Sequence, residues 1–269
     1  MKCERIPLGT QGAYLDTYFL ADSPELKAGA CRPAVVVCPG GGYAYTSDRE
    51  AEPIALALCA RGFHACVLRY PCAPARFPAA LRALAEAVAW VRAGAAENHV
   101  DPRQISVCGF SAGGHLAGSL GVFWNAPFLA AETGLVPQDM RPDKMVLCYP
   151  VITGGEFAHK GSFDNLLGAD ADAARRAEVS LEQHVTQDTP PAFLWHTYTD
   201  PGVPVENTML FAMALRRAGV PFESHIYSVG GHGLCLATRE TENMTGDNVQ
   251  KECAGWFDLM VSWLEREKN

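Results

Sequence analysis

The sequence predicts an α/β fold: a doubly wound, mostly parallel sheet with helices on both faces. Short apolar segments rich in β-branched and aromatic residues alternate with longer segments of helical periodicity, and most of the short segments are apolar on both faces. A strand in a parallel sheet covered by two helical layers needs that composition, whereas a strand with one solvent-exposed face would alternate apolar and polar residues. Strands are expected at 34–38, 64–70, 104–110, 144–150, 191–197 and 222–228.

Helices are expected between and after these strands. Residues 48–61 and 205–219 carry helical patterns that end at a glycine, which is a common residue just past a helix C-terminus. Residues 77–97 have apolar side chains at helical spacing and good helix formers. Residues 247–268 are expected to form an amphipathic closing helix with Asp247 as its candidate N-cap. The alternation of strand and helix implies right-handed crossovers.

The length of 269 residues fits one domain of this class, spanning residues 1–269 without a large cap domain. The exception to the regular alternation is 151–190, which is polar, interrupted by four glycines and too long for an ordinary connection between a strand and a helix. We call this segment the excursion. Two interpretations stay open for it: a small lid or substrate-binding loop, and a surface segment with no role in function.

Composition excludes several classes of partner. The net charge is −8 and no basic run occurs, which argues against binding to nucleic acid. No apolar stretch approaches the ~18–20 residues that span a bilayer, so a membrane partner is not expected. The N-terminus carries Lys2, Glu4 and Arg5 and has no long apolar region, so no secretory signal is expected. A cytoplasmic location is expected instead.

The ten cysteines are expected to be reduced rather than disulfide-bonded. Four of them, Cys38, Cys66, Cys108 and Cys148, lie inside expected strands, where cysteine behaves as a small buried hydrophobic residue. No C-x-x-C pair exists, so the sequence offers little support for a zinc–thiolate site, and no metal is expected.

The segment "GFSAG" at 109–113 fits the pattern G-x-S-x-G in the context that gives this pattern its meaning. It follows an expected strand and precedes a helical segment, as in a nucleophile elbow, where a strained turn exposes the serine hydroxyl. The turn leaves no room for side chains at Gly109 and Gly113. A phosphate-binding loop is a poor alternative, because no lysine follows. Ser111 is therefore the candidate nucleophile.

A second glycine cluster, "PGGGY" at 39–43, follows another expected strand. Glycines at a strand end leave backbone N–H groups accessible, and such groups can stabilise the oxyanion of an acyl-transfer intermediate. Gly41 and Gly42, together with the N–H of Ala112 after the serine, are the candidate oxyanion hole. The alternative is a flexible turn, but two glycine clusters at matching strand ends make that alternative weaker.

A serine nucleophile needs a histidine base, and His232 is the candidate. It lies in a glycine-flanked loop after the last expected strand, where the chain order Ser–acid–His places the base. The other histidines lie within strands (His64, His196, His225), on the helix after Ser111 (His115), before the strand that leads to it (His99) or in the excursion (His159, His184).

The acid that orients the base is expected between Ser111 and His232 in the chain. Asp200 follows the second-to-last expected strand, in "TDPGVP". Asp188 precedes that strand and would lie at the wrong edge of the sheet, and the aspartates of the excursion come too early. An aspartate in a Pro/Gly loop is usually a turn residue, but the position between a credible serine and a credible histidine favours a catalytic role here.

The segments "PGGGY", "GFSAGGH", "TDPGVPVEN" and "GGHG" resemble the α/β-hydrolase superfamily, and more narrowly its compact esterase/lipase branch, which includes acetyl-xylan-esterase-like carbohydrate esterases. The resemblance extends from about residue 33 to the C-terminus. One departure is Pro39, where hormone-sensitive-lipase-like members have histidine, and the chain also has no room for their longer N-terminal cap. The resemblance implies a small acyl group, with acetyl on a sugar or xylo-oligosaccharide as the leading case.

The expected activity is hydrolysis of small-acyl esters through a Ser–His–Asp acyl-enzyme mechanism, with no metal or organic cofactor. Tyr43, Tyr45, Phe157 and His159 are weak candidates to line the alcohol side of the pocket, and each has a structural interpretation as well. Two alternatives stay open: an amide hydrolase, such as a formamidase or small peptidase, with the same triad, and a ligand-binding protein that kept the fold and lost catalysis.

Overall fold

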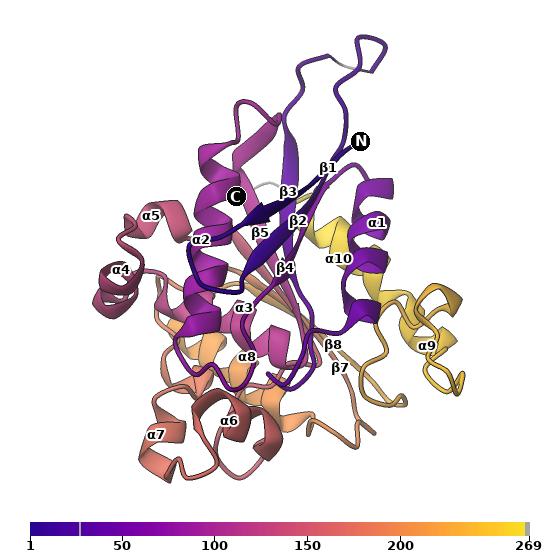
Figure 1. Ribbon diagram of the computed structural model, residues 1–269. Helices are drawn as coiled ribbons and strands as arrows, with labels where there is room; N and C mark the ends of the chain where they lie inside the picture. The colour runs from indigo at the N-terminus through magenta and orange to yellow at the C-terminus, as the bar shows by residue number, and fades with distance from the viewer. Residues whose placement is uncertain (27, 267–269) are drawn as a thin grey trace.

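The computed structural model describes residues 1–26 and 28–266, and its centre is one eight-stranded sheet (Figure 1). The strand order is β1-β2-β4-β3-β5-β6-β7-β8. β1 and β2 pair antiparallel, β2 pairs antiparallel with β4, and the six strands from β4 to β8 across the sheet are parallel. The bounds are β1 (Lys2–Pro7), β2 (Tyr14–Phe19), β3 (Arg32–Cys38), β4 (His64–Arg69), β5 (Val100–Phe110), β6 (Lys144–Cys148), β7 (Ala192–Thr197) and β8 (Phe222–Tyr227).

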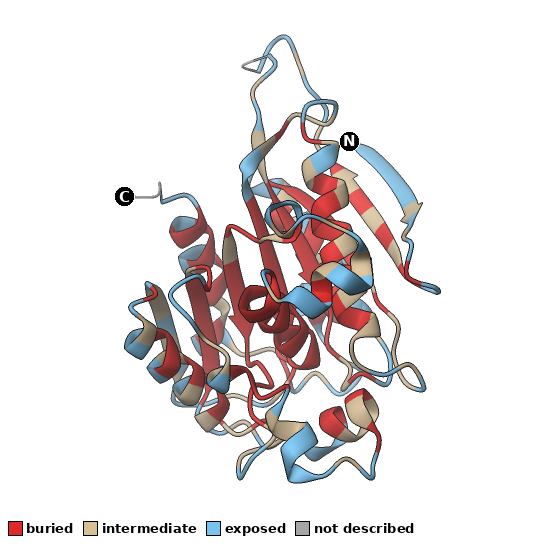
Figure 2. Cartoon of the chain, turned by 90° about the vertical axis from the view of Figure 1, so that its left-hand side faces the viewer, coloured by how far each residue is buried: buried red, intermediate tan, exposed pale blue. Residues whose placement is uncertain are grey.

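Helices cover both faces of the sheet, as its composition predicts. Alternate residues of each central strand enter two separate cores: Val36 packs in one, while Val35 and Val37 pack in the other. Figure 2 shows the buried band that runs through the sheet and through the helix after β5. The first core is closed by α2 (Ala79–Ala93), α3 (Ala112–Phe123) and α8 (Glu206–Ala218), and the second by α1 (Glu52–Ala60), α9 (Lys251–Ala254) and α10 (Trp256–Leu264).

All six expected strands are present, but the sequence analysis misses β1 and β2. β1 is an exposed edge strand and therefore carries no apolar run. β2 buries one face only, so Leu15, Thr17 and Phe19 alternate with more exposed residues. Two short helices beside α2, α4 (Pro127–Thr133) and α5 (Pro137–Met140), were not expected either.

The expectation of one closing helix over 247–268 is wrong. The chain forms α9 and α10, with Gly255 between them. Asp247 caps neither helix, since its carboxylate accepts a hydrogen bond from Asn243 Nδ2 at 2.6 Å. Glu267 and Lys268 of the expected helix lie outside the described residues. The helix expected at 48–61 begins as a 3-10 turn, Asp48–Glu50, before α1.

The excursion contains two helices, α6 (Lys160–Leu167) and α7 (Ala173–Ala177), followed by a 3-10 turn, Leu181–Gln183. They lie beyond the carboxyl ends of the parallel strands, at the bottom of Figure 1. Side chains cap both helices: His159 Nδ1 accepts the Ser162 N–H of α6, and the Asp172 carboxylate accepts the Arg175 N–H of α7. That the excursion acts as a lid or binding loop stays a prediction.

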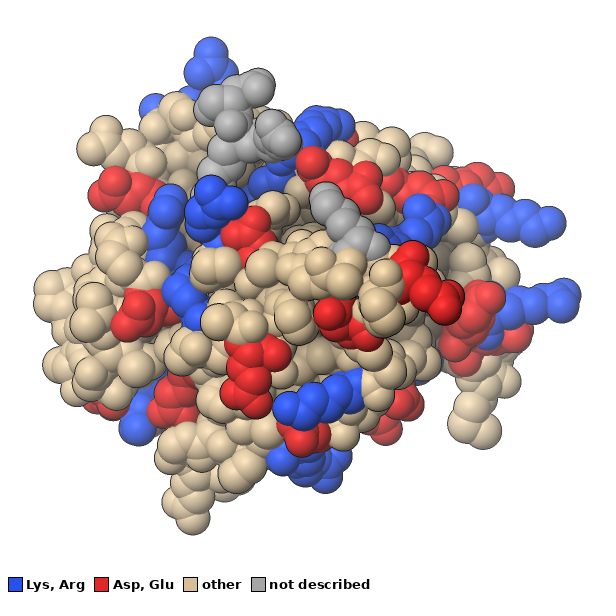
Figure 3. Space-filling view, turned by 90° about the horizontal axis from the view of Figure 1, so that it is seen from above, with Lys and Arg blue, Asp and Glu red and all other residues tan. Residues whose placement is uncertain are grey.

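The surface and the cysteines follow the composition. On the face seen in Figure 3, acidic and basic side chains are interspersed. Cys38, Cys66, Cys108 and Cys148 are buried with free thiols, which confirms their expected packing role. Within the described residues, no helix is long and apolar enough to cross a bilayer, and no group of three His, Cys, Asp or Glu side chains is placed to hold a metal ion.

Candidate active site

Ser111 lies in a sharp turn between β5 and α3. Its φ of 54° and ψ of −117° put a non-glycine residue in the left-handed half of conformational space, a strain that is typical of nucleophile elbows. A Cβ on Gly109 would lie 2.0 Å from the Gly113 carbonyl O, and a Cβ on Gly113 would lie 2.0 Å from the Cys38 carbonyl O. The expectation that the turn excludes side chains at both glycines is confirmed. The second contact also brings the elbow against the end of β3.

The structure brings Ser111, His232 and Asp200 into one hydrogen-bonded chain. Ser111 Oγ lies 2.8 Å from His232 Nε2, and His232 Nδ1 lies 2.7 Å from Asp200 Oδ2. An ionised carboxylate only accepts hydrogen bonds, so Nδ1 carries the proton and Nε2 is left to accept the serine O–H. The His232 side chain is 27% exposed, so the chain opens to solvent at the histidine.

Asp200 is held as an ionised acceptor. Its side chain is fully buried, and its Oδ1 accepts the N–H groups of Gly202 at 2.8 Å and Val203 at 2.9 Å. Burial opposes ionisation, but hydrogen bonds from His196 and His232, the charge of His232 and the Val203 N–H together hold the pKa of the Asp200 carboxyl below its ordinary value. The carboxylate therefore stays charged at neutral pH.

His196 is a part of this site that the sequence analysis misses. The sequence places it within a strand, and it is fully buried in β7, but its Nε2 lies 3.0 Å from the Val203 carbonyl O and 3.3 Å from Asp200 Oδ2. Both neighbours only accept, so Nε2 carries a proton, while Nδ1 accepts the Thr208 O–H at 2.8 Å. The sequence does carry one sign of this contact: His196 stands four residues before Asp200, at the end of the strand that leads to it.

The loop Gly40–Gly42 follows β3 and lies against the elbow, since a Cβ on Gly40 would come within 3.0 Å of Ser111 Cβ. Gly41 and Gly42 have φ values of 124° and 63°. Within the described part of the chain, the N–H groups of Gly41, Gly42 and Ala112 donate to no protein acceptor. These are the three donors that the sequence suggests for an oxyanion, and their role stays a prediction.

Tyr43 has the structural role that was one of its two interpretations. Its side chain is 3% exposed and packs in the first core, with its hydroxyl 2.8 Å from His115 Nδ1. His115 Nε2 lies 2.8 Å from the Val179 carbonyl O, which fixes Nδ1 as the acceptor of the tyrosine O–H. Burial lowers the pKa of His115 to about 4, so it remains neutral. The Tyr43 ring has little surface to offer a substrate, and His115, on the helix after Ser111, is buried beside it.

The other weak candidates remain accessible. Tyr45 is 64% exposed beside the Gly40–Gly42 loop, and Phe157 is half-buried in the excursion. Burial lowers the pKa of His159, and the neighbouring His232 lowers it further while Asp200 raises it, so His159 lies within electrostatic range of both. His159 Nδ1 lies 2.8 Å from Ser162 Oγ and 3.3 Å from the Ser162 backbone N.

A buried carboxylate joins the loops around the site. Glu50 is 3% exposed, and it accepts the Gly40 N–H at 2.7 Å and the Tyr149 O–H at 2.7 Å. The Tyr149 oxygen also accepts the Cys235 N–H at 3.0 Å, and its ring packs edge-on against His232 with centroids 5.1 Å apart. The network thus links the loops after β3, β6 and β8.

Sequence reasoning misses this network because its members are far apart in the chain. Glu50 lies in a segment of helical pattern where an acidic residue is usually solvated, and only its tertiary partners explain its burial. Burial, followed by the charge of Glu50, raises the pKa of Tyr149 well above its usual range. Tyr149 therefore stays protonated and acts as a donor to the carboxylate.

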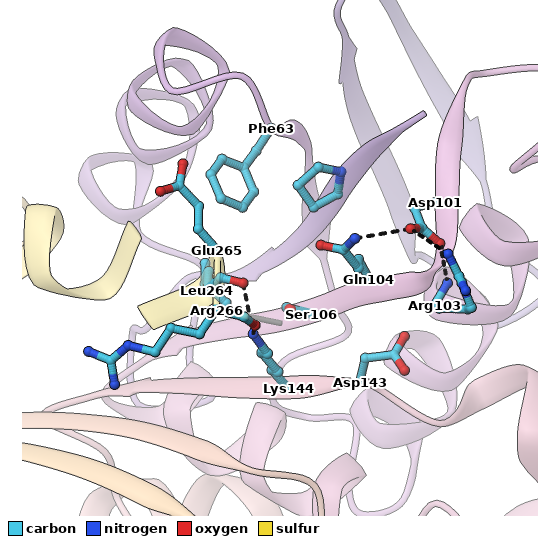
Figure 4. Close-up of a pocket in the computed structure, with 11 residues that line it drawn as sticks. Phe63, Asp101, Arg103, Gln104, Ser106, Asp143, Lys144, Leu264, Glu265 and Arg266 are labelled. Atoms are coloured by element: carbon cyan, nitrogen blue, oxygen red, sulfur yellow. Dashed lines mark hydrogen bonds and ion pairs between the residues drawn. The ribbon is translucent and has the colours of Figure 1, made fainter. Parts of the chain in front are cut away.

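A cavity of about 480 Å³ lies at the opposite edge of the sheet, where β5 and β6 begin (Figure 4). Several of its polar side chains already have partners: Asp101 bonds to Arg103 and Gln104, and Lys144 Nζ bonds to the carbonyl O of Leu264 at 2.7 Å. None of the candidate site residues lines it.

Known proteins resemble the chain over most of its length. It is 38% identical over 218 residues to an endo-1,4-beta-xylanase B of Butyrivibrio fibrisolvens, covering 78% of this chain and 33% of that protein. It is 29% identical over 231 residues to an acetylxylan esterase of Xylanibacter ruminicola, covering 82% of this chain and 43% of that protein. The chain thus spans between a third and a half of the length of these two relatives.

Solved structures align over nearly the whole chain. An acetyl ester-xyloside bifunctional hydrolase from Caldicellulosiruptor lactoaceticus superposes with a TM-score of 0.83 at 37% identity, covering 97% of this chain and 95% of that chain. The carboxylesterase Cest-2923 from Lactobacillus plantarum superposes with a TM-score of 0.87 at 30% identity, covering 98% and 97%. Residues 22–215 match the model of the BD-FAE family. The chain therefore belongs to the BD-FAE family and has the α/β-hydrolase fold of the esterase type.

Proposed function

We propose that this protein is a serine carboxylic-ester hydrolase in which Ser111 is the nucleophile, His232 the general base and Asp200 the residue that orients the base. The observation that carries the proposal is the hydrogen-bonded chain of 2.8 Å and 2.7 Å through these three side chains, beside backbone N–H groups that have no protein acceptor in the described residues. A metal-free acyl transfer needs a nucleophile, a base and oxyanion donors, and this arrangement supplies all three.

The reaction proceeds in two steps. Ser111 Oγ attacks the ester carbonyl carbon while His232 Nε2 takes its proton, and the resulting imidazolium is stabilised by Asp200. Collapse of the tetrahedral intermediate expels the alcohol, which receives that proton. Water then attacks the acyl-serine, again with His232 as the base, and releases the acid and the free enzyme. The N–H groups of Gly41, Gly42 and Ala112 bind both oxyanions, and each such donor contributes about 3–4 kcal/mol.

The proposed substrate class is an acetyl ester of a carbohydrate. Support comes from the names of its relatives, an acetylxylan esterase and an acetyl ester-xyloside hydrolase, and from the absence of a large cap in the described residues. His159 and Phe157, both half-buried in the excursion, are proposed to contact the alcohol side of the substrate.

The test is a screen of acetylated sugars and xylo-oligosaccharides for released acetate, together with p-nitrophenyl acetate, butyrate and octanoate. We expect acetate release from acetylated sugars by the wild type and none by Ser111→Ala. Failure of the wild type to hydrolyse any of these esters contradicts the proposed activity. A preference for octanoate over acetate contradicts the small-acyl assignment alone.

A further inference from the structure

The excursion contacts the proposed oxyanion loop through one side chain. Asn165, on α6, donates a hydrogen bond from Nδ2 to the Gly42 carbonyl O at 2.9 Å. The two residues are 123 positions apart in the chain, so no local turn brings them together. This bond connects a segment without an assigned role to a residue whose N–H we place in the oxyanion hole.

The carbonyl groups of the loop determine where its N–H groups point. The Gly40 carbonyl O accepts the Ser47 N–H at 2.9 Å, and the Gly41 carbonyl O accepts the Ala44 N–H at 3.0 Å. In a trans peptide the N–H points opposite to the C=O, so these bonds direct the N–H groups of Gly41 and Gly42 away from their own turn. Both bonds are local and come from the backbone.

The Gly42 carbonyl differs, because in the described residues Asn165 is its donor and no backbone N–H reaches it. Gly42 has a φ of 63°, and a Cβ there would meet no atom closer than 3.9 Å. Neighbouring atoms therefore do not restrain Gly42 sterically. Glycine has the largest backbone freedom of any residue. The peptide before Gly42 is held by the Ala44 N–H, and the peptide after it is held by the bond from Asn165, which comes from outside the loop. Asn165 therefore restrains rotation on the C-terminal side of Gly42.

Asn165 is itself anchored. Its carbonyl O accepts a hydrogen bond from the Arg76 guanidinium, and the next carbonyl, of Leu166, accepts the Phe77 N–H at 2.9 Å. The segment that contains Arg76 and Phe77 also bonds to the residue after Gly42, because the Ala73 N–H donates to the Tyr43 carbonyl O at 2.7 Å. The side chain thus projects from a fixed backbone.

We propose that Asn165 is a positioning residue that holds the peptide between Gly42 and Tyr43, so that the turn presenting the Gly41 and Gly42 N–H groups keeps its shape and the excursion completes the oxyanion hole. The inference rests on the proposed esterase function. Acylation and deacylation each form an oxyanion in the same hole, so a misaligned donor slows both steps by a similar factor. The ratio of the two rates, which enters KM, then changes little while kcat falls.

The experiment compares Asn165→Ala, Asn165→Asp and Lys160→Ala with the wild type. Asn165→Asp preserves size but places an oxygen where the donor was. Lys160→Ala is the control for loosening α6, because it removes the ion pair of that helix between Lys160 and Asp164 and leaves Asn165 intact. The measurements are kcat and KM for p-nitrophenyl acetate, inhibition by an aryl trifluoromethyl ketone, whose adduct with serine is a hemiketal oxyanion, and Tm.

We expect kcat to fall about 10- to 100-fold in both Asn165 variants, the loss typical of a misplaced catalytic group, with KM near the wild-type value. The inhibition constant of the ketone should rise by the same factor. Lys160→Ala should keep wild-type kcat whatever its Tm.

Other outcomes overturn the proposal. If the wild type is active and the Asn165 variants keep wild-type kcat and ketone affinity, the positioning role is wrong and the esterase function stands. If Lys160→Ala loses as much kcat as Asn165→Ala, the effect belongs to the helix as a whole. A wild type without activity on any ester would overturn the esterase function and, with it, this inference.

Discussion

The two edges of the central sheet carry polar groups of similar kinds, but they differ in where the donors point. At the amino edge, several charged groups that line the 480 Å³ cavity already have partners, as Asp101 has in Arg103 and Gln104. At the carboxyl edge, the N–H groups of Gly41 and Ala112 have no protein acceptor in the described part of the chain, and Ser111 sits in a strained turn.

The comparison teaches that a hollow surface is not by itself a site. Donors that are already bonded gain little from a ligand, because binding must replace existing hydrogen bonds. Donors held in place without an acceptor gain a hydrogen bond when an oxyanion forms, at no cost in reorganisation. The predictions below test this difference between the edges.

The largest difference is expected from removing the nucleophile or the base. Ser111→Ala or His232→Ala should lower kcat by roughly 10⁴–10⁶, because the hydroxyl and the imidazole act as one unit. At the amino edge, Arg103→Ala should leave kcat unchanged, since its partner is Asp101 on the same strand. Steady-state kinetics with p-nitrophenyl acetate measures all three, and near-wild-type rates in the Ser111 or His232 variant would show that the wrong residue was chosen.

Removing the charge of the orienting acid should have a smaller effect. Asp200→Asn should lower kcat by about 10⁴ or less, because an amide at this position favours the wrong imidazole tautomer while leaving the other groups in place. The control is Asp188→Asn, an exposed residue before β7, which should keep wild-type kcat. If kcat falls further in the Asp188 variant than in the Asp200 variant, the orienting acid is Asp188 and the assignment of Asp200 is wrong.

Blocking the oxyanion loop should cost less again. In Gly41→Ala the new Cβ would lie 2.2 Å from the Tyr45 carbonyl O, so the loop must shift. The expected loss in kcat is about 10²–10³, the value of one oxyanion donor. Gly12→Ala is the matched control, since Gly12 also has a positive φ, of 78°, but its Cβ would meet nothing within 4 Å. The control should lose about 1–2 kcal/mol of stability and no activity.

The smallest effect is expected in the buried network. Tyr149→Phe removes a donor to the buried Glu50 carboxylate and an acceptor for the Cys235 N–H. It should lower the free energy of unfolding by about 1–3 kcal/mol, measured by urea denaturation. Tyr18→Phe, which removes an exposed bond to Glu52, should cost within about 0.5 kcal/mol. Equal losses in the two variants would contradict a special role for the buried network.

Much of the fold follows from patterns that are local in the sequence. The parallel strands are apolar on both faces because both faces are covered, and that composition is visible without coordinates. β1 cannot be predicted in this way because an edge strand needs no apolar run. The break at Gly255 cannot be predicted either, because the amphipathic pattern continues through α9 and α10.

The site divides along the same line. Ser111, His232 and Asp200 can be chosen as candidates without coordinates, since chain order and strand-end glycines restrict where a nucleophile, a base and an acid can lie. Three features need the folded chain: Tyr43 packs in the core, the buried His196 and Glu50 bond to groups of the site, and Asn165 bonds to Gly42 from the excursion. These contacts join residues distant in the chain, and a hydrogen bond between such residues leaves no periodic pattern in the sequence.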